Sequence, residues 1–270
     1  THLQLYNAYI SLAGFGEVNQ VPANPQQQTE FIENAAEHLQ EATMKEGLAI
    51  KEENRLWLAN HYYQKVKEFH EGPRSQEASM HPEVANAIDR ASSHYQEVLF
   101  SGQKLTVITA NNLHLEHEML KFAKLLEYQG NNDQKLTVLK DLLEQQSEKP
   151  EINWMSQKQA LYELATTYAA LGQKESAYET YSFINSQANH FPTALANNAS
   201  LEAARLHFEL LEEGLKNESN EEVLAILNDL KELQIRKNAS SEPAHLEAAL
   251  EYARIRSDIS NPEEQDNRYL

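Results

Sequence analysis

Cysteine is absent from this sequence, and glycine and proline are scarce. None of the 270 residues is cysteine, and only 8 are glycine and 8 proline. A chain without thiols can form no disulfide, no thiolate metal site and no cysteine nucleophile. Alanine, leucine, glutamate, glutamine and lysine dominate instead, and these residues lose little side-chain freedom in a helix. We therefore expect an all-α fold.

Positive charge is the second shortage. Lys and Arg number 23 against 41 Asp and Glu, which gives a formal net charge of −18. Nucleic acids and anionic membrane surfaces are bound through basic patches, and the sequence has no Lys/Arg cluster to form one. The charge keeps the chain soluble, predicts no nucleic-acid partner and favours a neutral or basic protein partner. Alternatively, the acidic side chains only solvate outer helix faces.

Long apolar runs and targeting signals are missing as well. No stretch of the sequence approaches the roughly 18 apolar residues of a membrane span, and no signal peptide is visible. We therefore predict no membrane insertion within these residues. Because the first residue is Thr1 and not methionine, one interpretation is a piece of a longer chain. The compartment stays open between the cytoplasm and the bacterial periplasm or cell envelope.

Familiar catalytic motifs are also lacking. The sequence contains no glycine-rich phosphate loop and no G-x-S-x-G nucleophile elbow, which are the signatures of nucleotide-binding and hydrolase sites. Carboxylate pairs such as Glu52–Glu53 and Glu212–Glu213 are adjacent in sequence, and adjacent residues of a helix do not face each other. We therefore predict no catalytic residue, no cofactor and no enzymatic activity.

The N-terminal region has a helical pattern. Residues 1–28 are expected to form a short amphipathic helix followed by a polar linker that contains two prolines. Residues 29–103 are expected to hold divergent helical repeats, the first of which begins at the N-cap residue Thr29. The helices expected in this region cover residues 29–50, 53–71 and 82–100.

A repeat with a period of 42 residues lies within residues 104–260. Glycine stands at 130, 172 and 214, so both intervals between successive glycines are 42 residues. Apolar residues recur at fixed offsets around each glycine. Four residues before it are Leu126, Tyr168 and Leu210, eight before it are Phe122, Leu164 and Leu206, and nine after it are Leu139, Tyr181 and Val223.

These offsets describe a helical hairpin. Apolar residues three, four and seven apart form one stripe on a helix, and glycine ends a helix because it takes the left-handed C-cap conformation at little cost. A second stripe follows each glycine, so each unit is two antiparallel helices. Single hairpins cannot bury both stripes, and we expect them to stack into an α-α superhelix. A capping helix over 242–258 and a polar tail over 261–270 would complete it.

The best unit, residues 161–184, resembles a tetratricopeptide repeat. The family pattern sets large apolar, small and aromatic residues in a fixed order at fixed spacing. Small residues let the two helices approach closely, and aromatic residues fill the space between neighbouring helices. The residues that match the pattern are Leu161, Leu164, Ala165, Tyr168, Gly172, Ala177 and Tyr181.

Two departures from the family pattern leave room for a HEAT-like or other α-solenoid. The family repeat has about 34 residues, whereas this period is 42. The flanking units are degenerate, because Lys135 and Ser219 stand where the family prefers alanine and His207 where it prefers a small residue. The hairpin spacing is preserved, so the additional residues are expected between units.

The resemblance implies a function as well as a fold. Tetratricopeptide repeats bind peptides in a concave groove lined by the first helix of each pair, and chaperone-binding members use Lys and Asn to clamp a C-terminal carboxylate. The matching positions here lack that clamp and are mostly apolar or aromatic, which suits a helical or extended apolar segment. We therefore expect a non-catalytic scaffold or adaptor whose partner-binding residues are Leu120, Lys124, Tyr162, Thr166 and Phe208.

Three other interpretations remain. Tyr162 and Phe208 can serve as packing between repeats, or the groove can hold a helix of the same chain. The cluster at His114–Glu118 can support a metal-binding or enzymatic role. The spacing of this cluster is not that of the zinc-protease motif H-E-x-x-H. The Glu-x-x-His spacing of di-iron sites occurs once in the whole sequence, at Glu242–His245, where two copies are needed. We therefore predict no metal site. The chain can also be a structural module of a longer envelope-associated protein.

Overall fold

The computed structural model describes residues 1–15, 25–46, 52–72, 81–100, 115–147, 154–212, 225–226 and 228–231. Every regular element in these ranges is helical, and none of them forms a strand. The prediction of an all-α fold is confirmed. The predictions for the glycine at 214, the helix over 242–258 and the tail over 261–270 lie outside these described residues.

The chain divides into two compact units, Thr1–Gly130 and Asn131–Leu270, and each is described by itself. The sequence placed a boundary near residue 103, before the periodic region. The observed division comes later because helix α6 (Leu115–Tyr128) packs on the helix that precedes it in unit 1.

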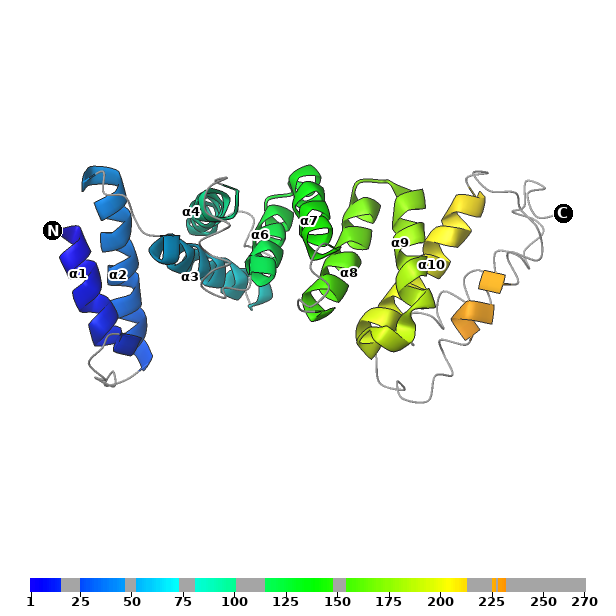
Figure 1. The fold of residues 1–270 in the computed structure, drawn as a ribbon, viewed down its shortest axis with the longest axis horizontal. Coiled ribbons are helices and arrows are strands. Elements are labelled where there is room, and N and C mark those ends of the chain that lie inside the picture. The colour runs from blue at the N-terminus through cyan, green and yellow to red at the C-terminus, as the bar shows by residue number, and fades with distance from the viewer. Residues whose placement is uncertain are drawn as a thin grey trace. The chain divides into compact units, whose positions relative to one another are not determined.

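The described part of unit 1 forms two helical hairpins followed by α6 (Figure 1). Helix α1 packs along α2 and α3 packs along α4, whereas α2 touches α3 only sparsely. Helix α6 packs mainly on α4, in the order expected of a solenoid. The bounds are α1 His2–Ile10, a π-helical turn Ser11–Phe15, α2 Pro25–Glu46, α3 Glu52–Glu71 and α4 Pro82–Leu99.

The predicted start of α2 was wrong. Thr29 was expected to cap the helix, but α2 begins at Pro25 and Thr29 lies inside it. Proline suits the first helical turn, because its fixed φ matches the helix and its missing N–H has no partner there in any case. The helices predicted over 53–71 and 82–100 agree with α3 and α4 to within a residue at either end.

Asn60 ties the helices of unit 1 together. Its side-chain oxygen, on α3, accepts hydrogen bonds from Tyr95 Oη of α4 at 3.1 Å and from Lys121 Nζ of α6 at 2.5 Å. Burial raises the pKa of Tyr95, helped by the carboxylate of Glu118, so the hydroxyl stays protonated and able to donate. The Tyr95 hydroxyl, the Asn60 amide oxygen and the Lys121 ammonium are therefore paired across these three helices, as most buried polar groups are.

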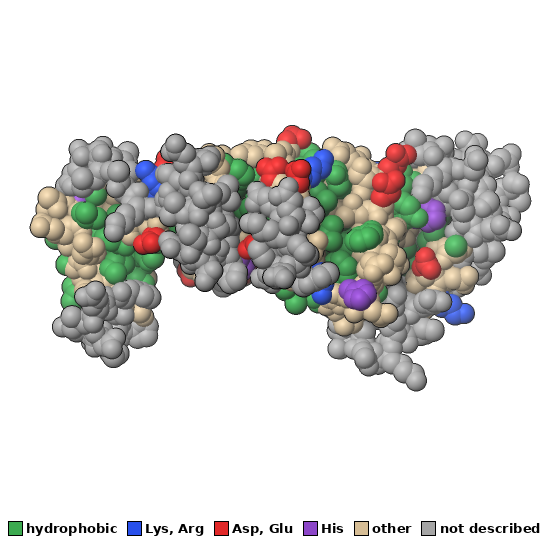
Figure 2. All heavy atoms as spheres, viewed as in Figure 1, with side chains coloured by type: hydrophobic (Ala, Val, Ile, Leu, Met, Phe, Trp, Pro, Cys, Tyr) green, Lys and Arg blue, Asp and Glu red, His purple; other side chains and the backbone are tan. Residues whose placement is uncertain are grey.

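The first hairpin of unit 1 has an apolar outer surface. Leu5 and Leu12 are 45% and 41% exposed, and Leu3 is 36% exposed. No charged residue occurs in this first segment, residues 1–15. Figure 2 shows hydrophobic side chains at the surface of this hairpin, at the left of the view. None of the described helices is both long enough and apolar enough to cross a membrane.

Four helices of unit 2 within residues 132–212 pack in chain order. Helix α7 packs on α8, α8 on α9 and α9 on α10 (Figure 1). Sequential packing of helical hairpins is a solenoid-like arrangement, as the periodicity predicted. The bounds are α7 Asn132–Ser147, α8 Trp154–Ala170, α9 Lys174–Ser186, a 3-10 turn Ala188–His190 and α10 Thr193–Glu212.

The glycines at the ends of α6 and α8 have the predicted conformation. Gly130 and Gly172 have φ of 70° and 71°. At Gly172 the N–H of Gln173 donates to Tyr168 O and the N–H of Gly172 to Ala169 O, which together form a Schellman motif. A Cβ at either glycine would meet no atom within 4 Å. The backbone conformation alone therefore calls for glycine here.

The 42-residue register corresponds to buried positions. In α8 and α9, Ala165, Ala177 and Ile184 have no exposed area, and they pack with Ala199 and Leu206 of α10. The small residues lie at the helix contacts, where close approach leaves no room for larger side chains. The equivalent apolar residues of α6 and α7, which are Met119, Phe122, Leu126, Leu139 and Leu142, are buried in their own units.

Candidate functional site

The predicted partner-binding residues in unit 1 lie on α6. Leu120 and Lys124 are both partly exposed. Lys124 Nζ forms an ion pair with Glu127 Oε1 at 2.5 Å, and the same ammonium lies 5.3 Å from the centre of the Tyr128 ring. The positive charge of Lys124 is thus already engaged within its own helix.

Tyr162 of α8 lies among three helices of unit 2. Its ring meets the Tyr181 ring of α9 edge-on, with centroids 5.8 Å apart. Burial and the nearby carboxylates of Glu202 and Glu163 raise the pKa of Tyr162, and a hydrogen bond with Asn198 of α10 opposes them. Tyr162 therefore packs between neighbouring hairpins while part of its surface stays open.

The other two predicted residues of unit 2 differ sharply in exposure. Thr166 is partly exposed, and its hydroxyl donates to the backbone oxygen of Glu163 at 2.8 Å. Phe208 has no exposed area, so its ring offers nothing to a partner in this conformation. This burial agrees with the alternative that Phe208 serves as packing between repeats, because a large aromatic side chain gains free energy from burial inside the stack.

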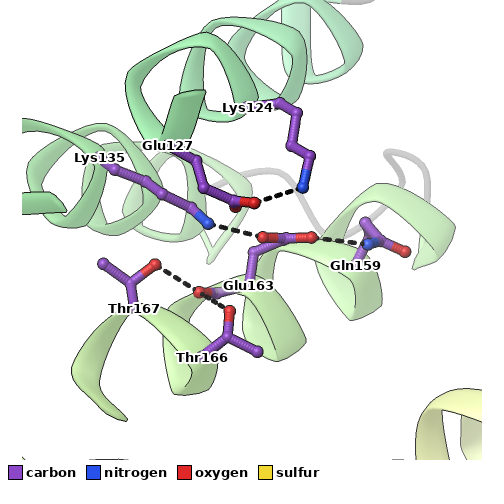
Figure 3. A network of polar contacts seen from close by, with 7 residues as sticks. All are labelled: Lys124, Glu127, Lys135, Gln159, Glu163, Thr166 and Thr167. Carbon is purple, nitrogen blue, oxygen red and sulfur yellow. Dashed lines mark hydrogen bonds and ion pairs between the residues drawn. The ribbon is translucent and has the colours of Figure 1, made fainter. Parts of the chain in front are cut away.

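A buried ion pair next to these residues was not predicted. Lys135 of α7, only 2% exposed, places Nζ 2.8 Å from Glu163 Oε2 of α8. The other oxygen of the same carboxylate accepts a hydrogen bond from Gln159 Nε2 at 3.2 Å (Figure 3). Thr166 and Thr167 donate to the backbone oxygen of Glu163 from the next turn. Glu163 thus joins α7 to α8.

The best-formed depression of the described residues is a cleft in unit 1. It has a volume of about 910 Å³ and lies between α2, α3 and α4. It forms where the first hairpin meets the second, since α2 and α3 touch only sparsely. The apolar part of its lining consists of Ile32, Phe69, Val84 and Ala87. This cleft was not predicted from the sequence, because it depends on how three successive helices pack and not on any local motif.

Aromatic and histidine rings form one wall of the cleft. The ring of His61 stacks on Trp57 with centroids 5.7 Å apart and meets Tyr62 edge-on at 5.2 Å. Burial lowers the pKa of His61 to about 4, with Lys65 acting in the same direction. His61 is therefore neutral at physiological pH and contributes an uncharged ring.

The cluster at His114–Glu118 is described only in part. His114 lies outside the described residues, and His117 is exposed on α6. Glu118 Oε1 pairs with Lys121 Nζ at 3.0 Å, so that carboxylate is engaged with a cation of its own helix. In the described part of the chain, no three His, Asp or Glu side chains come together as a metal site would require.

Comparison with known proteins adds no identity. No protein-family model matches the chain, and no curated protein matches it as a relative. Function must therefore be inferred from the residues and geometry of the chain itself.

Proposed function

We propose that this chain is a non-catalytic helical-repeat adaptor that binds a segment of a partner protein. The observation that carries this proposal is the cleft between α2, α3 and α4, which has a volume of about 910 Å³. Binding pockets fall in this range of size and combine apolar walls with a few polar groups. Helical repeats use the surfaces between neighbouring hairpins for such contacts.

We also infer that the hairpin of α8 and α9 is tetratricopeptide-like. The fully buried Ala165 and Ala177 support this inference, since they stand at the family's small positions. The Schellman motif at Gly172 supports it as well. Fold alone names no partner, so the proposal of binding depends on the surfaces and not on the resemblance.

The inferred groove residues are a second candidate surface. Tyr162 and Thr166 in unit 2, and Leu120 and Lys124 in unit 1, are all partly exposed. Tyr162 and Lys124 already contact their own chain through Tyr181 and Glu127. The cleft is therefore the primary candidate and the groove the secondary one.

A peptide selection on the full chain tests the proposal. Peptides enriched from a displayed random library would be measured against wild type, Phe69→Ser and Phe183→Ser. Phe69 lines the cleft, whereas Phe183 is 51% exposed on α9. Loss of an aromatic anchor should weaken binding by at least about tenfold, so Phe69→Ser is expected to lose this much and Phe183→Ser to match wild type.

Two results and one control would separate the alternatives. Failure to enrich any peptide would reject the adaptor function. Weaker binding in Tyr162→Ala/Thr166→Ala, with Phe69→Ser unchanged, would move the binding site to the groove. Circular dichroism of each variant must match wild type, so that a lost site is not confused with a lost fold.

A further inference from the structure

Three carboxylates surround the cleft, and each comes from a different helix. Glu37 lies on α2, Glu68 on α3 and Glu83 on α4, and all three line the cleft and are exposed. Glu68 Oε1 accepts a hydrogen bond from Gln64 Nε2 at 3.1 Å. Within the described part of the chain, none of the three is paired with a cationic side chain. These three glutamates, which we call the rim, therefore carry negative charge that no described cationic side chain neutralises.

The two cations of the lining, Lys65 and Arg90, are already engaged with other residues of the lining. Lys65 Nζ pairs with Glu33 Oε1 at 2.8 Å. Arg90 Nη1 donates to Tyr62 Oη at 2.9 Å, Arg90 Nε donates to Asn86 Oδ1 at 2.8 Å, and the guanidinium lies over the Tyr62 ring. Because His61 is neutral, the ionised groups of the lining are four glutamates against one lysine and one arginine. The lining is thus net negative.

Apolar side chains, which we call the floor, share the cleft lining with these glutamates. Ile32 from α2, Phe69 from α3 and Val84 from α4 line the cleft together. A segment that fits this arrangement needs apolar side chains for the floor and positive charge for the rim, because complementary potentials steer a partner in and fix its orientation. The net charge of −18 opposes the approach of acidic segments, of nucleic acid and of a second copy of this chain.

We propose that the cleft between α2, α3 and α4 binds a partner-protein segment in which Lys or Arg residues flank apolar residues. This proposal rests on the adaptor function proposed above and names the chemistry of the partner. The apolar side chains enter between Ile32, Phe69 and Val84, and the basic side chains reach the carboxylates of Glu37, Glu68 and Glu83. Each helix supplies one apolar and one acidic contact, so the site exists only when the two hairpins stand together.

The test uses three fluorescent peptides that differ only in charge. The first contains leucine, alanine and lysine, and in the others glutamine or glutamate replaces every lysine. Their binding to the full chain is measured by fluorescence anisotropy at physiological salt. The lysine peptide should bind the wild type roughly tenfold more tightly than the glutamine peptide, equivalent to about 1.4 kcal/mol, and the glutamate peptide should bind most weakly.

Matched variants separate the cleft from the overall charge of the protein. The triple variant Glu37→Gln/Glu68→Gln/Glu83→Gln removes the rim charge. It should weaken binding of the lysine peptide roughly tenfold, to the affinity of the glutamine peptide. Glu30→Gln/Glu53→Gln/Asp89→Asn makes the same change in net charge at exposed positions of the same helices outside the cleft. This control should stay within about twofold of wild type, a difference small on the energy scale of binding.

The outcomes distinguish this proposal from the adaptor function itself. Equal losses in the two triple variants would attribute the effect to long-range attraction and overturn the proposal. Equal binding of the lysine and glutamine peptides, with both lost in Phe69→Ser, would keep the cleft as a binding site and reject basic partners. If no peptide binds here and the library selection also fails, both proposals fall together.

Discussion

Two positions of unit 2 that are equivalent in the repeat solve the same packing problem differently. Lys135 in α7 and Ala177 in α9 are 42 residues apart, and both are almost fully buried. Lys135 pairs with Glu163 of the next helix, whereas Ala177 packs among Tyr181, Ile184 and the apolar residues of α10. The degenerate repeat thus keeps the helix geometry and changes the chemistry of the contact.

The difference shows what each solution requires of its neighbour. A buried alanine needs only close packing, whereas a buried ammonium needs a carboxylate fixed beside it, because burial removes its hydration. The position equivalent to Glu163 in the following repeat is held by Arg205. A cation at that position could not neutralise a lysine at position 177 as Glu163 neutralises Lys135. Each contact is therefore matched to its own partner helix.

A lysine at position 177, the repeat equivalent of Lys135, should cause the largest loss of stability. Ala177→Lys places a long cation among Ala165, Tyr181 and Leu206 in a contact without free volume. Overpacking and an uncompensated charge together should lower the free energy of unfolding by about 4 kcal/mol or more. Urea unfolding followed by circular dichroism measures this loss. Glu179→Lys, on the exposed side of α9, should change stability by less than about 0.5 kcal/mol; similar losses in both variants would contradict the role of burial.

Removing the carboxylate tests the other side of the comparison. Glu163→Ala removes the carboxylate that lies 2.8 Å from the buried Lys135 ammonium, and we expect a loss of about 3 kcal/mol. Lys135→Ala/Glu163→Ala removes both charges and should be more stable than Glu163→Ala alone. Urea unfolding followed by circular dichroism measures the stability of each variant. A double variant less stable than the single one would show that the pair does not act as a unit.

His94 of unit 1 shows a different response to burial, because it stays neutral where Lys135 stays charged and is paired with a carboxylate. His94 Nε2 lies 3.0 Å from Gln40 Oε1, and burial, with Arg55 and Arg90, lowers the pKa of His94 to about 4. The unfolded state, with a pKa near 6.5, binds the proton first. Stability present above pH 6.5 is therefore lost as pH falls from 6.5 to about 4, by about 2 kcal/mol between pH 7 and 5.

The measurement is urea unfolding of unit 1 at several pH values, followed by Trp57 fluorescence in a Trp154→Phe background. His94→Gln should remove about half of the pH dependence above pH 5. His61 contributes much of the rest, since burial lowers its pKa to about 4 as well, and His70 adds to it because burial and Lys124 lower its pKa. An unchanged pH dependence in His94→Gln would show that His94 is not the group that titrates.

Substitution of the two turn glycines should give the smallest loss of stability and compares two equivalent turns of the repeat. Gly130 and Gly172 share a positive φ and open surroundings, so alanine at either site should cost only the backbone term, about 1 kcal/mol. Gly172→Asn should cost less, because asparagine tolerates this conformation better. Thermal unfolding followed by circular dichroism measures both. A much larger loss at one glycine would mean that the two turns differ in more than backbone conformation.

Much of the fold could be predicted from the apolar periodicity and from the glycine and proline residues that mark helix ends. Glycine at 130 and 172 located the helix ends, and Pro82 located the start of α4. The start of α2 was missed because both Thr29 and Pro25 are good first-turn residues, and sequence alone does not choose between them. Helix identity was thus easier to predict than helix boundaries.

The candidate site was much harder to predict. A lysine in an amphipathic pattern indicates a solvent-facing position, so the burial of Lys135 beside Glu163 carried no local signal. Phe208 matched a groove position by register, yet its burial depends on neighbours that periodicity does not describe. The cleft depends on how sparsely α2 meets α3, which is a tertiary property that no window of sequence contains.

The pair between Lys135 and Glu163 also bears on the order in which the hairpins assemble. Similar hairpins in tandem can dock on the wrong neighbour during folding, because their apolar faces are alike. If α7 docked on α10 in place of α8, Lys135 would meet Arg205 where it now meets Glu163. The mismatch would place two like charges in a dry contact. The ion pair therefore favours docking of α7 on α8, the helix that follows it, and disfavours exchange of hairpins between chains.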